Sequence, residues 1–74
     1  MLKEKIIVTG GLGFIGSNLI ELLLKKNYQV ANIDKINYSS NFYNTLEFKR
    51  NKHYKFYKCD LNDYKKLNSI INKF

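Results

Sequence analysis

Seventy-four residues are enough for one small domain, which buries only a modest share of its surface on folding. The chain carries a net charge of +7, from 13 basic and 6 acidic residues, yet its lysines are scattered and Arg50 is its single arginine. Because recognition of nucleic-acid phosphates and bases favours arginine, this composition favours a solvated basic surface over nucleic-acid binding.

The first apolar run, from Lys5 to Thr9, is β-branched and lacks polar alternation, which predicts a buried parallel strand with helices on both faces of its sheet. It is too short for a signal peptide, and no apolar run approaches the length of a membrane span. The glycine-dense turn that follows, residues 10–16, holds all four glycines of the chain. A strand before it, a helix after it and an acid about twenty residues on form the context of a loop that binds a dinucleotide pyrophosphate. We therefore expect the phosphates to lie on free N–H groups at the start of the helix, where the dipole also favours negative charge.

Two glycine registers fit this turn. Gly11-Leu12-Gly13-Phe14-Ile15-Gly16 matches G-x-G-x-x-G, and Gly10, Gly13 and Gly16 match G-x-x-G-x-x-G. Such a loop needs glycine for a backbone conformation that is costly for other residues, for close approach of the backbone to the phosphates, and for close packing of the helix on the strand. The sequence leaves open which glycine serves which purpose.

Residues 14–26 have a helical apolar period and are predicted to form a helix. The apolar stripe of this helix consists of Ile15, Leu19, Leu22 and Leu23, widened by Ile20 and Leu24. Asn27 tolerates the left-handed conformation and is the expected end of the helix.

A second strand is predicted over residues 28–33, ending at Asp34, eighteen residues after the last glycine of the turn. A carboxylate at this place accepts hydrogen bonds from the adenosine ribose hydroxyls. Its charge also repels a 2′-phosphate, which favours NAD over NADP, although Lys35 beside it weakens that preference.

The remaining chain predicts a short irregular helix over residues 42–49, a third strand over residues 53–59 and a last helix. His53 has no neighbour at metal-ligand spacing and is expected to be a strand-edge residue. Cys59 is the single cysteine, which argues against a disulfide or a metal site and fits a reducing, cytoplasmic setting. Asp60 follows the third strand, at the crevice where nucleotides bind in such sheets.

The last helix is expected to begin at residues 61–63, with Asn62 or Asp60 as its cap. Its apolar face is formed by Leu61, Tyr64, Leu67, Ile70 or Ile71, and Phe74. The order β-α-β-(α)-β-α predicts the α/β class, as one half of a Rossmann-type doubly wound parallel sheet with strand order 3-2-1. The first strand would then be the open edge of an incomplete sheet, where a second copy of the chain could pair. We therefore expect residues 1–74 to form an N-terminal, partial dinucleotide-binding domain.

Three stretches resemble the extended short-chain dehydrogenase/reductases that act on nucleotide sugars. Residues 9–17 read Thr-Gly-Gly-Leu-Gly-Phe-Ile-Gly-Ser and keep the family pattern TGGxGFIGS in full. Residues 34–41 resemble the D-K-L-T-Y-A-G-N segment of dTDP-glucose 4,6-dehydratases, with Asn37 in place of threonine and Ser40 in place of glycine. Residues 59–63 resemble the V-D-I-x-D that follows the third strand of this family. The second stretch favours a dehydratase over a 4-epimerase.

The resemblance implies NAD as the cofactor and a set of contacts along it. The implied contacts are Gly10, Gly13, Phe14, Ile15 and Gly16 at the pyrophosphate, Asp34, Lys35, Ile36 and Asn37 at the adenosine ribose, and Asp60 and Leu61 at the adenine. The implied chemistry is hydride transfer from sugar C4 to NAD, loss of water across C5 and C6, and return of the hydride to C6. In this family a Tyr-x-x-x-Lys pair serves the redox step.

One match to Tyr-x-x-x-Lys, formed by Tyr54 and Lys58, falls in the predicted third strand. Residues four apart are separated by roughly 13 Å on a strand, whereas on a helix they are neighbours. We therefore predict no catalytic residue in this chain, and a nucleotide-sugar substrate only where the rest of such an enzyme is present. The sequence leaves two alternatives open. The chain could be a fragment of a related 4-epimerase, or it could be a small non-catalytic module that binds a nucleotide or a partner.

Overall fold

The structure, a computed structural model, describes residues 4–36, 42–46 and 48–74. Its elements follow in the order β1 (Lys5–Thr9), α1 (Phe14–Lys25), β2 (Gln29–Asp34), the 3-10 helix η1 (Phe42–Thr45), β3 (Tyr54–Lys58) and α2 (Tyr64–Lys73). The predicted order is confirmed, and the irregular helix expected over residues 42–49 is a 3-10 helix of four residues. Within the described ranges, no helix is long and apolar enough to cross a bilayer.

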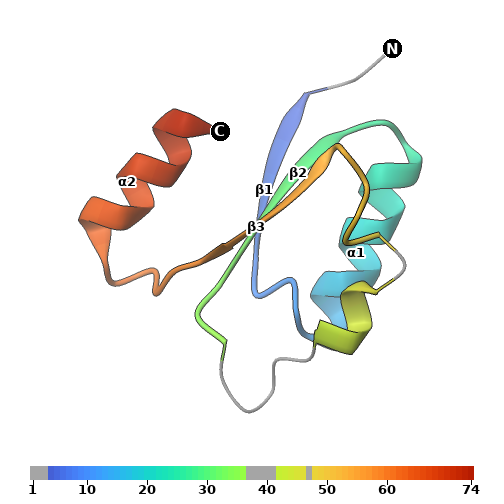
Figure 1. The fold of residues 1–74 in the computed structure, drawn as a ribbon, viewed down its shortest axis with the longest axis horizontal. Helices are drawn as coiled ribbons and strands as arrows, with labels where there is room; N and C mark the ends of the chain where they lie inside the picture. Colours follow the sequence, from blue (N-terminus) through green and yellow to red (C-terminus); the bar gives the residue numbers. More distant parts are fainter. Residues whose placement is uncertain (1–3, 37–41, 47) are drawn as a thin grey trace.

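The three strands form one parallel sheet with β2 in the middle, in the order β1-β2-β3, which is the order 3-2-1 read from the other edge. Figure 1 shows α1 and η1 on one side of this sheet and α2 on the other. The strand ends are in register, because Thr9 pairs with Ile33 and Asp34 pairs with Lys58. The segments that follow the three strands therefore meet at one end of the sheet.

Each face of the sheet has its own apolar core. On the α1 side, one core is built from all three strands, α1 and the segment after η1: Val8, Ile20, Val30, Phe48 and Tyr54. On the α2 side, a smaller core joins Ile33, Cys59 and Ile70, with Tyr57 and Leu67 packed against it. Successive side chains of β2 point to opposite faces, so one strand serves both cores.

Burial differs sharply between β1 and β2, which are neighbours in the sheet. Five of the six residues of β2 are buried, whereas in β1 only Val8 is buried and Ile7 is 38% exposed. The prediction of a buried first strand is therefore wrong. The reason is that α2 packs over β2 and β3, through Ile70 on Ile33 and Cys59, and leaves that face of β1 uncovered. The expected open edge at β1 is confirmed.

The buried side of α1 is rotated relative to the predicted stripe. Gly16 faces the glycine turn, so the positions four and eight residues later, Ile20 and Leu24, fall on the same side of the helix. Ile20 is fully buried and Leu23 and Leu24 pack against the core. The remaining predicted stripe residues stay 82%, 45% and 50% exposed, namely Ile15, Leu19 and Leu22. The predicted helix end is confirmed, since Asn27 has φ = +69°.

The start of α2 differs from the prediction. Asp63 is the cap, and its Oδ1 accepts from Lys66 N at 3.2 Å. Asp60 and Asn62 are therefore not the cap, and Asp60 instead orders the loop before α2: its Oδ1 accepts from Asn62 N at 2.9 Å and its carbonyl accepts from Asp63 N. The predicted apolar face is also narrower than expected: Ile70 is buried, whereas Leu61, Tyr64 and Ile71 are 45%, 71% and 47% exposed.

We expect Asp63→Ala to lower the free energy of unfolding by about 1 kcal/mol, the usual cost of removing a helix cap. Urea unfolding followed by circular dichroism measures this value. The matched control is Asn62→Ala, one position away, which should change it by less than about 0.5 kcal/mol. Equal costs for the two variants would contradict the assignment of Asp63 as the cap.

Candidate functional site

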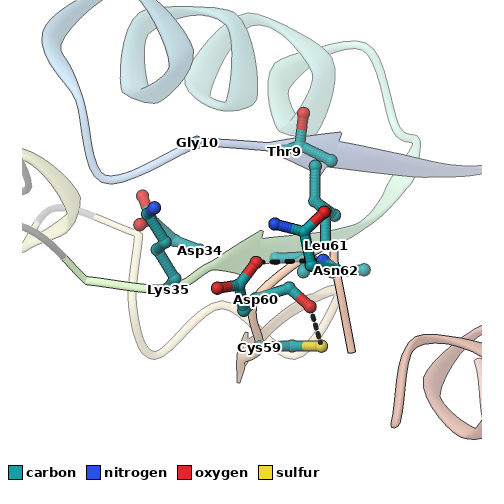
Figure 2. A pocket seen from close by; sticks show the side chains of 9 residues that line it. Thr9, Gly10, Asp34, Lys35, Cys59, Asp60, Leu61 and Asn62 are labelled. Carbon is teal, nitrogen blue, oxygen red and sulfur yellow. Dashed lines mark hydrogen bonds between the residues drawn. The ribbon is translucent and has the colours of Figure 1, made fainter. Parts of the chain in front are cut away.

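A cavity of about 390 Å³ lies where the three parallel strands end. Its lining comes from the segments that follow β1, β2 and β3: Thr9, Gly10, Ile33, Asp34, Lys35, Cys59, Asp60, Leu61 and Asn62. Figure 2 shows Asp34 and Lys35 at the end of β2, and Asp60 beside them on the segment after β3. Ligands of open α/β sheets bind outside these carboxyl ends, so the cavity occupies the place predicted for the cofactor.

The glycine turn begins with a position that suits glycine for conformational reasons. Gly10 has φ = +70°, in the left-handed region where residues with a Cβ are strained. Its N–H donates to Ile33 O at 2.9 Å, and its carbonyl accepts from Gly13 N at 3.1 Å. Gly10 therefore supplies the conformation that turns the chain out of β1.

Packing accounts for two more glycines. A Cβ on Gly16 would lie 2.6 Å from Gly10 O and 2.9 Å from Gly11 Cα, and a Cβ on Gly11 would overlap the side chains of Asn32 and Ile20. These two positions let the turn and the start of α1 lie close on each other and on β2.

Gly13 is the position for which neither conformation nor packing demands glycine. Its φ of −76° and ψ of 170° suit any residue, and an added Cβ would meet Gly10 O at 3.4 Å, an ordinary contact. Gly13 is also the N-cap of α1, where no side chain provides a cap. A bare backbone at the start of a helix fits the close approach of a phosphate.

The first turn of α1 is open to solvent. Phe14 and Ile15 are 76% and 82% exposed, and the turn carries no acidic residue. The first N–H groups of a helix have no partner within the helix, and the dipole makes this end positive. The turn therefore offers hydrogen-bond donors and a favourable field to an anion.

Asp34 ties the glycine turn to the end of β2. Its Oδ2 accepts from Leu12 N at 3.1 Å, and its Oδ1 accepts from Ile36 N at 2.8 Å. The carboxylate is 6% exposed and lines the cavity. The second hydrogen bond holds Ile36 at φ = +62°, which turns the chain sharply after the strand. Asp34 is thus both a wall of the cavity and a clamp on the loop.

The segment after β3 closes the other side of the cavity. Asp60 is exposed, and its Oδ1 accepts from Asn62 N at 2.9 Å. Cys59 is buried beneath it, and its Sγ–H donates to the Asp60 carbonyl at 3.3 Å. These bonds fix the backbone that carries Asp60 and Leu61 along the cavity (Figure 2).

A chain of buried polar side chains lies beneath the turn and was not predicted from the sequence. Asn32 is fully buried, its Oδ1 accepts from Gly11 N at 2.8 Å, and its Nδ2 donates to the Tyr54 hydroxyl at 3.2 Å. On the other side of the turn, Asn44 Nδ2 donates to Leu12 O at 3.1 Å. The sequence does hold one sign of a role for Asn32. It is a polar residue inside an apolar strand, and it lies two positions before Asp34 and therefore on the same face of the sheet. Tyr54, the hydrogen-bond partner of Asn32 in β3, is not marked in this way by the sequence.

The strand geometry separates Tyr54 from Lys58, as predicted. Both lie in β3, where Tyr54 is buried under the turn and Lys58 is exposed. Burial raises the pKa of Tyr54, the hydrogen bond from Asn32 partly lowers it, and the Asp34 charge adds to the rise. The Tyr54 hydroxyl therefore stays protonated at neutral pH and serves the buried chain. Within the described ranges, no group of three or more metal-ligating His, Cys, Asp or Glu side chains occurs, and His53 is half-buried next to β3.

The structure places ten of the eleven predicted cofactor contacts, and Asn37 lies outside the described residues. Five of them line the cavity: Gly10, Asp34, Lys35, Asp60 and Leu61. Four form the cap and first turn of α1: Gly13, Phe14, Ile15 and Gly16. Ile36 takes part through its N–H, which donates to Asp34.

Two curated proteins with similar sequences are dTDP-glucose 4,6-dehydratases. The chain is 40% identical over 72 residues to the dTDP-D-glucose 4,6-dehydratase of Dictyostelium discoideum, covering 95% of this chain and 17% of that protein. It is 40% identical over 70 residues to the dTDP-glucose 4,6-dehydratase of Haemophilus influenzae, covering 93% of this chain and 21% of that protein. The chain thus spans about a fifth of the length of these curated relatives.

A solved structure is similar to this chain in both fold and sequence. The crystal structure of a dTDP-glucose 4,6-dehydratase from Bacillus anthracis, in complex with NAD, superposes with a TM-score of 0.91 at 33% identity and covers 96% of this chain and 24% of that one. A family model, described as GDP-mannose 4,6 dehydratase, matches residues 7–74. Because that match includes nearly the whole sequence, together with the glycine turn and the segment after β3, the chain belongs to this dehydratase family.

Proposed function

We propose that this chain binds NAD, with the pyrophosphate on the glycine turn and the adenosine in the cavity at the strand ends. The observation that carries the proposal is Gly13, a glycine for which the fold itself gives no reason. The open first turn of α1 supports the same placement, since it offers N–H groups and a positive dipole to the phosphates. The NAD complex of the Bacillus anthracis relative supports this choice of cofactor.

In the proposed complex, Asp34 accepts hydrogen bonds from the adenosine ribose. Lys35, Ile36 and Asn37 lie along the ribose, and Asp60 and Leu61 lie along the adenine. The pyrophosphate lies against Gly13, whose own N–H donates to Gly10 O, and takes the backbone N–H groups of Phe14, Ile15 and Gly16 at the start of α1. This arrangement uses both carboxylates of the cavity and explains why they stand on adjacent strand ends.

The same carboxylate sets the expected choice between cofactors. A 2′-phosphate on the ribose would bring negative charge against Asp34, which is 6% exposed and poorly screened by water. Lys35 is exposed beside it, so its compensation is screened by solvent. We therefore propose NAD rather than NADP.

The protein to which these residues belong is proposed to be a nucleotide-sugar 4,6-dehydratase that acts in the cytoplasm. Bound NAD supplies the acceptor that takes a hydride from the sugar and later returns it. This chain's own part is to bind and orient that cofactor, with its adenosine end fixed by Asp34 and Asp60. The two relatives support the dehydratase class over a 4-epimerase, and the single thiol, Cys59, supports a reducing compartment.

Isothermal titration calorimetry of the 74-residue chain tests the cofactor proposal. We expect NAD and ADP-ribose to bind, and NADP to bind at least about tenfold more weakly, which is about 1.4 kcal/mol. Circular dichroism of the same sample reports whether the chain is folded. A folded chain that binds none of these ligands at millimolar concentration would overturn the proposal, and equal affinity for NAD and NADP would overturn the role given to Asp34.

The same chain is proposed to lack dehydratase activity by itself, because its one Tyr-x-x-x-Lys match lies on β3, with Tyr54 buried and Lys58 exposed. Incubation with dTDP-glucose and NAD, followed by chromatographic detection of the 4-keto-6-deoxy product, measures this directly. Turnover above that of a buffer blank would contradict the proposal.

A further inference from the structure

We propose that Tyr54 is a positioning residue, which acts through Asn32 to hold the glycine turn in the conformation that receives the pyrophosphate. The proposal rests on the proposed NAD site. It adds Tyr54, a residue of β3 that is not among the proposed contacts with the cofactor. Gly11 follows β1, Asn32 lies in β2 and Tyr54 lies in β3, so the chain of hydrogen bonds crosses the whole sheet.

The buried position of Asn32 makes its two hydrogen bonds depend on each other. The Asn32 side chain is fully buried under the turn, and it lies against the backbone of Gly11, next to the Ile20 side chain. Gly11 N–H is a donor, so Asn32 must present Oδ1 to it, and Nδ2 then points to the Tyr54 hydroxyl. Removing the hydroxyl leaves a buried donor without a partner, which favours states in which Asn32 turns away from Gly11.

Tyr54 is well placed to fix that hydroxyl. The side chain is 8% exposed, and its ring packs edge-on against Phe48 with 4.9 Å between the centroids. In the sheet register Tyr54 pairs with Val30, two residues before Asn32 on the same face. The ring therefore has little freedom, and the position of its oxygen is set by the apolar core.

Three consecutive backbone N–H groups hold the turn against β2, and the Gly11–Asn32 hydrogen bond is the middle one. Gly10 N donates to Ile33 O, Gly11 N to Asn32, and Leu12 N to Asp34, so three successive N–H groups bind β2. Gly13 N donates to Gly10 O, so the N–H groups proposed for the pyrophosphate begin at Phe14. Loss of the middle contact lets the turn shift against α1, which misaligns those groups while the adenosine end of the cavity, on the ends of β2 and β3, stays in place.

The test is Tyr54→Phe in the 74-residue chain, which keeps the ring and removes only the hydroxyl. We expect the affinity for NAD to fall about tenfold, while the affinity for adenosine, which has no phosphate, changes by less than about twofold. The amide of Gly11 should also exchange its hydrogen faster than in the unchanged chain. The matched control is Tyr57→Phe, in the same strand but packed in the core on the other face, which should leave NAD affinity and Gly11 exchange unchanged.

Three outcomes would overturn the proposal: an equal loss of affinity for NAD and adenosine, an unchanged NAD affinity, or loss of the folded state in Tyr54→Phe. A measurement on the unchanged chain is independent of any variant: Gly11 should exchange more slowly than Phe14, whose N–H lies in the first turn of α1, and equal rates would also overturn it. If the unchanged chain binds no NAD, the proposed function fails. The Gly11 exchange rates then still report separately whether Tyr54 holds the turn.

Discussion

Gly16→Ala is expected to abolish dinucleotide binding and to lower the free energy of unfolding by about 3 kcal/mol, at the upper end of the usual cost of overpacking. The added methyl group would lie 2.6 Å from Gly10 O and 2.9 Å from Gly11 Cα. Both atoms belong to the backbone, so no rotamer change can relieve the contact. The turn and the start of α1 must move apart, and the N–H groups that are proposed to bind the pyrophosphate move with them. Urea unfolding and a calorimetric titration with NAD measure the two effects.

Gly13→Ala is the matched comparison, because it adds the same group to the same turn. Its backbone angles suit alanine, and the nearest atom would be 3.4 Å away. We expect its unfolding free energy to stay within about 0.5 kcal/mol of the unchanged chain, while NAD affinity falls at least about tenfold because the methyl group occupies the phosphate's approach. Equal destabilisation by the two variants, or normal NAD affinity in Gly13→Ala, would contradict the separate roles assigned to these glycines.

Asp34→Ala is expected to have the second large effect, on stability and on binding together. It removes the acceptor from two backbone N–H groups, those of Leu12 and Ile36. Leu12 is fully buried, so its N–H cannot turn to water, and an unsatisfied buried donor costs about 1–3 kcal/mol. We expect the free energy of unfolding to fall by about 2–3 kcal/mol, and NAD affinity to fall with it, because the ribose contact and the clamp on the turn are lost at once.

Asp34→Asn separates the effect of the charge from the effect of the hydrogen bonds that Asp34 accepts from Leu12 N and Ile36 N. The amide keeps the shape of the side chain and one acceptor oxygen, so it should cost less stability than Asp34→Ala. It removes the repulsion of a 2′-phosphate, and the ratio of NAD to NADP affinity should fall toward one. A ratio that is unchanged in Asp34→Asn would show that this carboxylate does not select the cofactor.

The elements that the sequence predicts well are those whose cause is local. The apolar run of β1, the glycine turn and Asn27 each carry their own signal, in composition, spacing or tolerance of positive φ. The place of Asp34 at the end of β2 was predicted in the same way, from the number of residues that separate it from the glycine turn. The strand assignment of Tyr54 and Lys58, which keeps the two side chains apart, is confirmed.

The features that could not be predicted depend on contacts between elements. The buried side of α1 is set by Gly16 against the turn rather than by the apolar period, and this rotates Ile20 inward and leaves Leu19 and Leu22 exposed. At the start of α2, Asp60 accepts from Asn62 N and Asp63 accepts from Lys66 N, so Asp63 is the cap. Several polar residues were near enough in sequence to serve as caps, so spacing could not choose among them.

The candidate site shows the same division. The residues that are proposed to face the cofactor lie in contiguous sequence motifs, whereas the residues that hold the turn from behind come from separate strands. Asn32 and Tyr54 are 22 positions apart and meet only because β2 and β3 pair in parallel. Residues of this supporting kind become visible once the sheet register is known.

The most direct test of the account is a titration of the ¹⁵N-labelled chain with NAD, followed by amide chemical shifts. We expect the largest shifts at Gly13, Phe14 and Ile15, and a second group of shifts at Lys35, Asp60 and Leu61. The far end of α2, at Ile70 and Lys73, should be unaffected. A folded spectrum whose shifts bypass the glycine turn, or that does not change at millimolar NAD, would contradict the claim that this turn is a cofactor-binding loop.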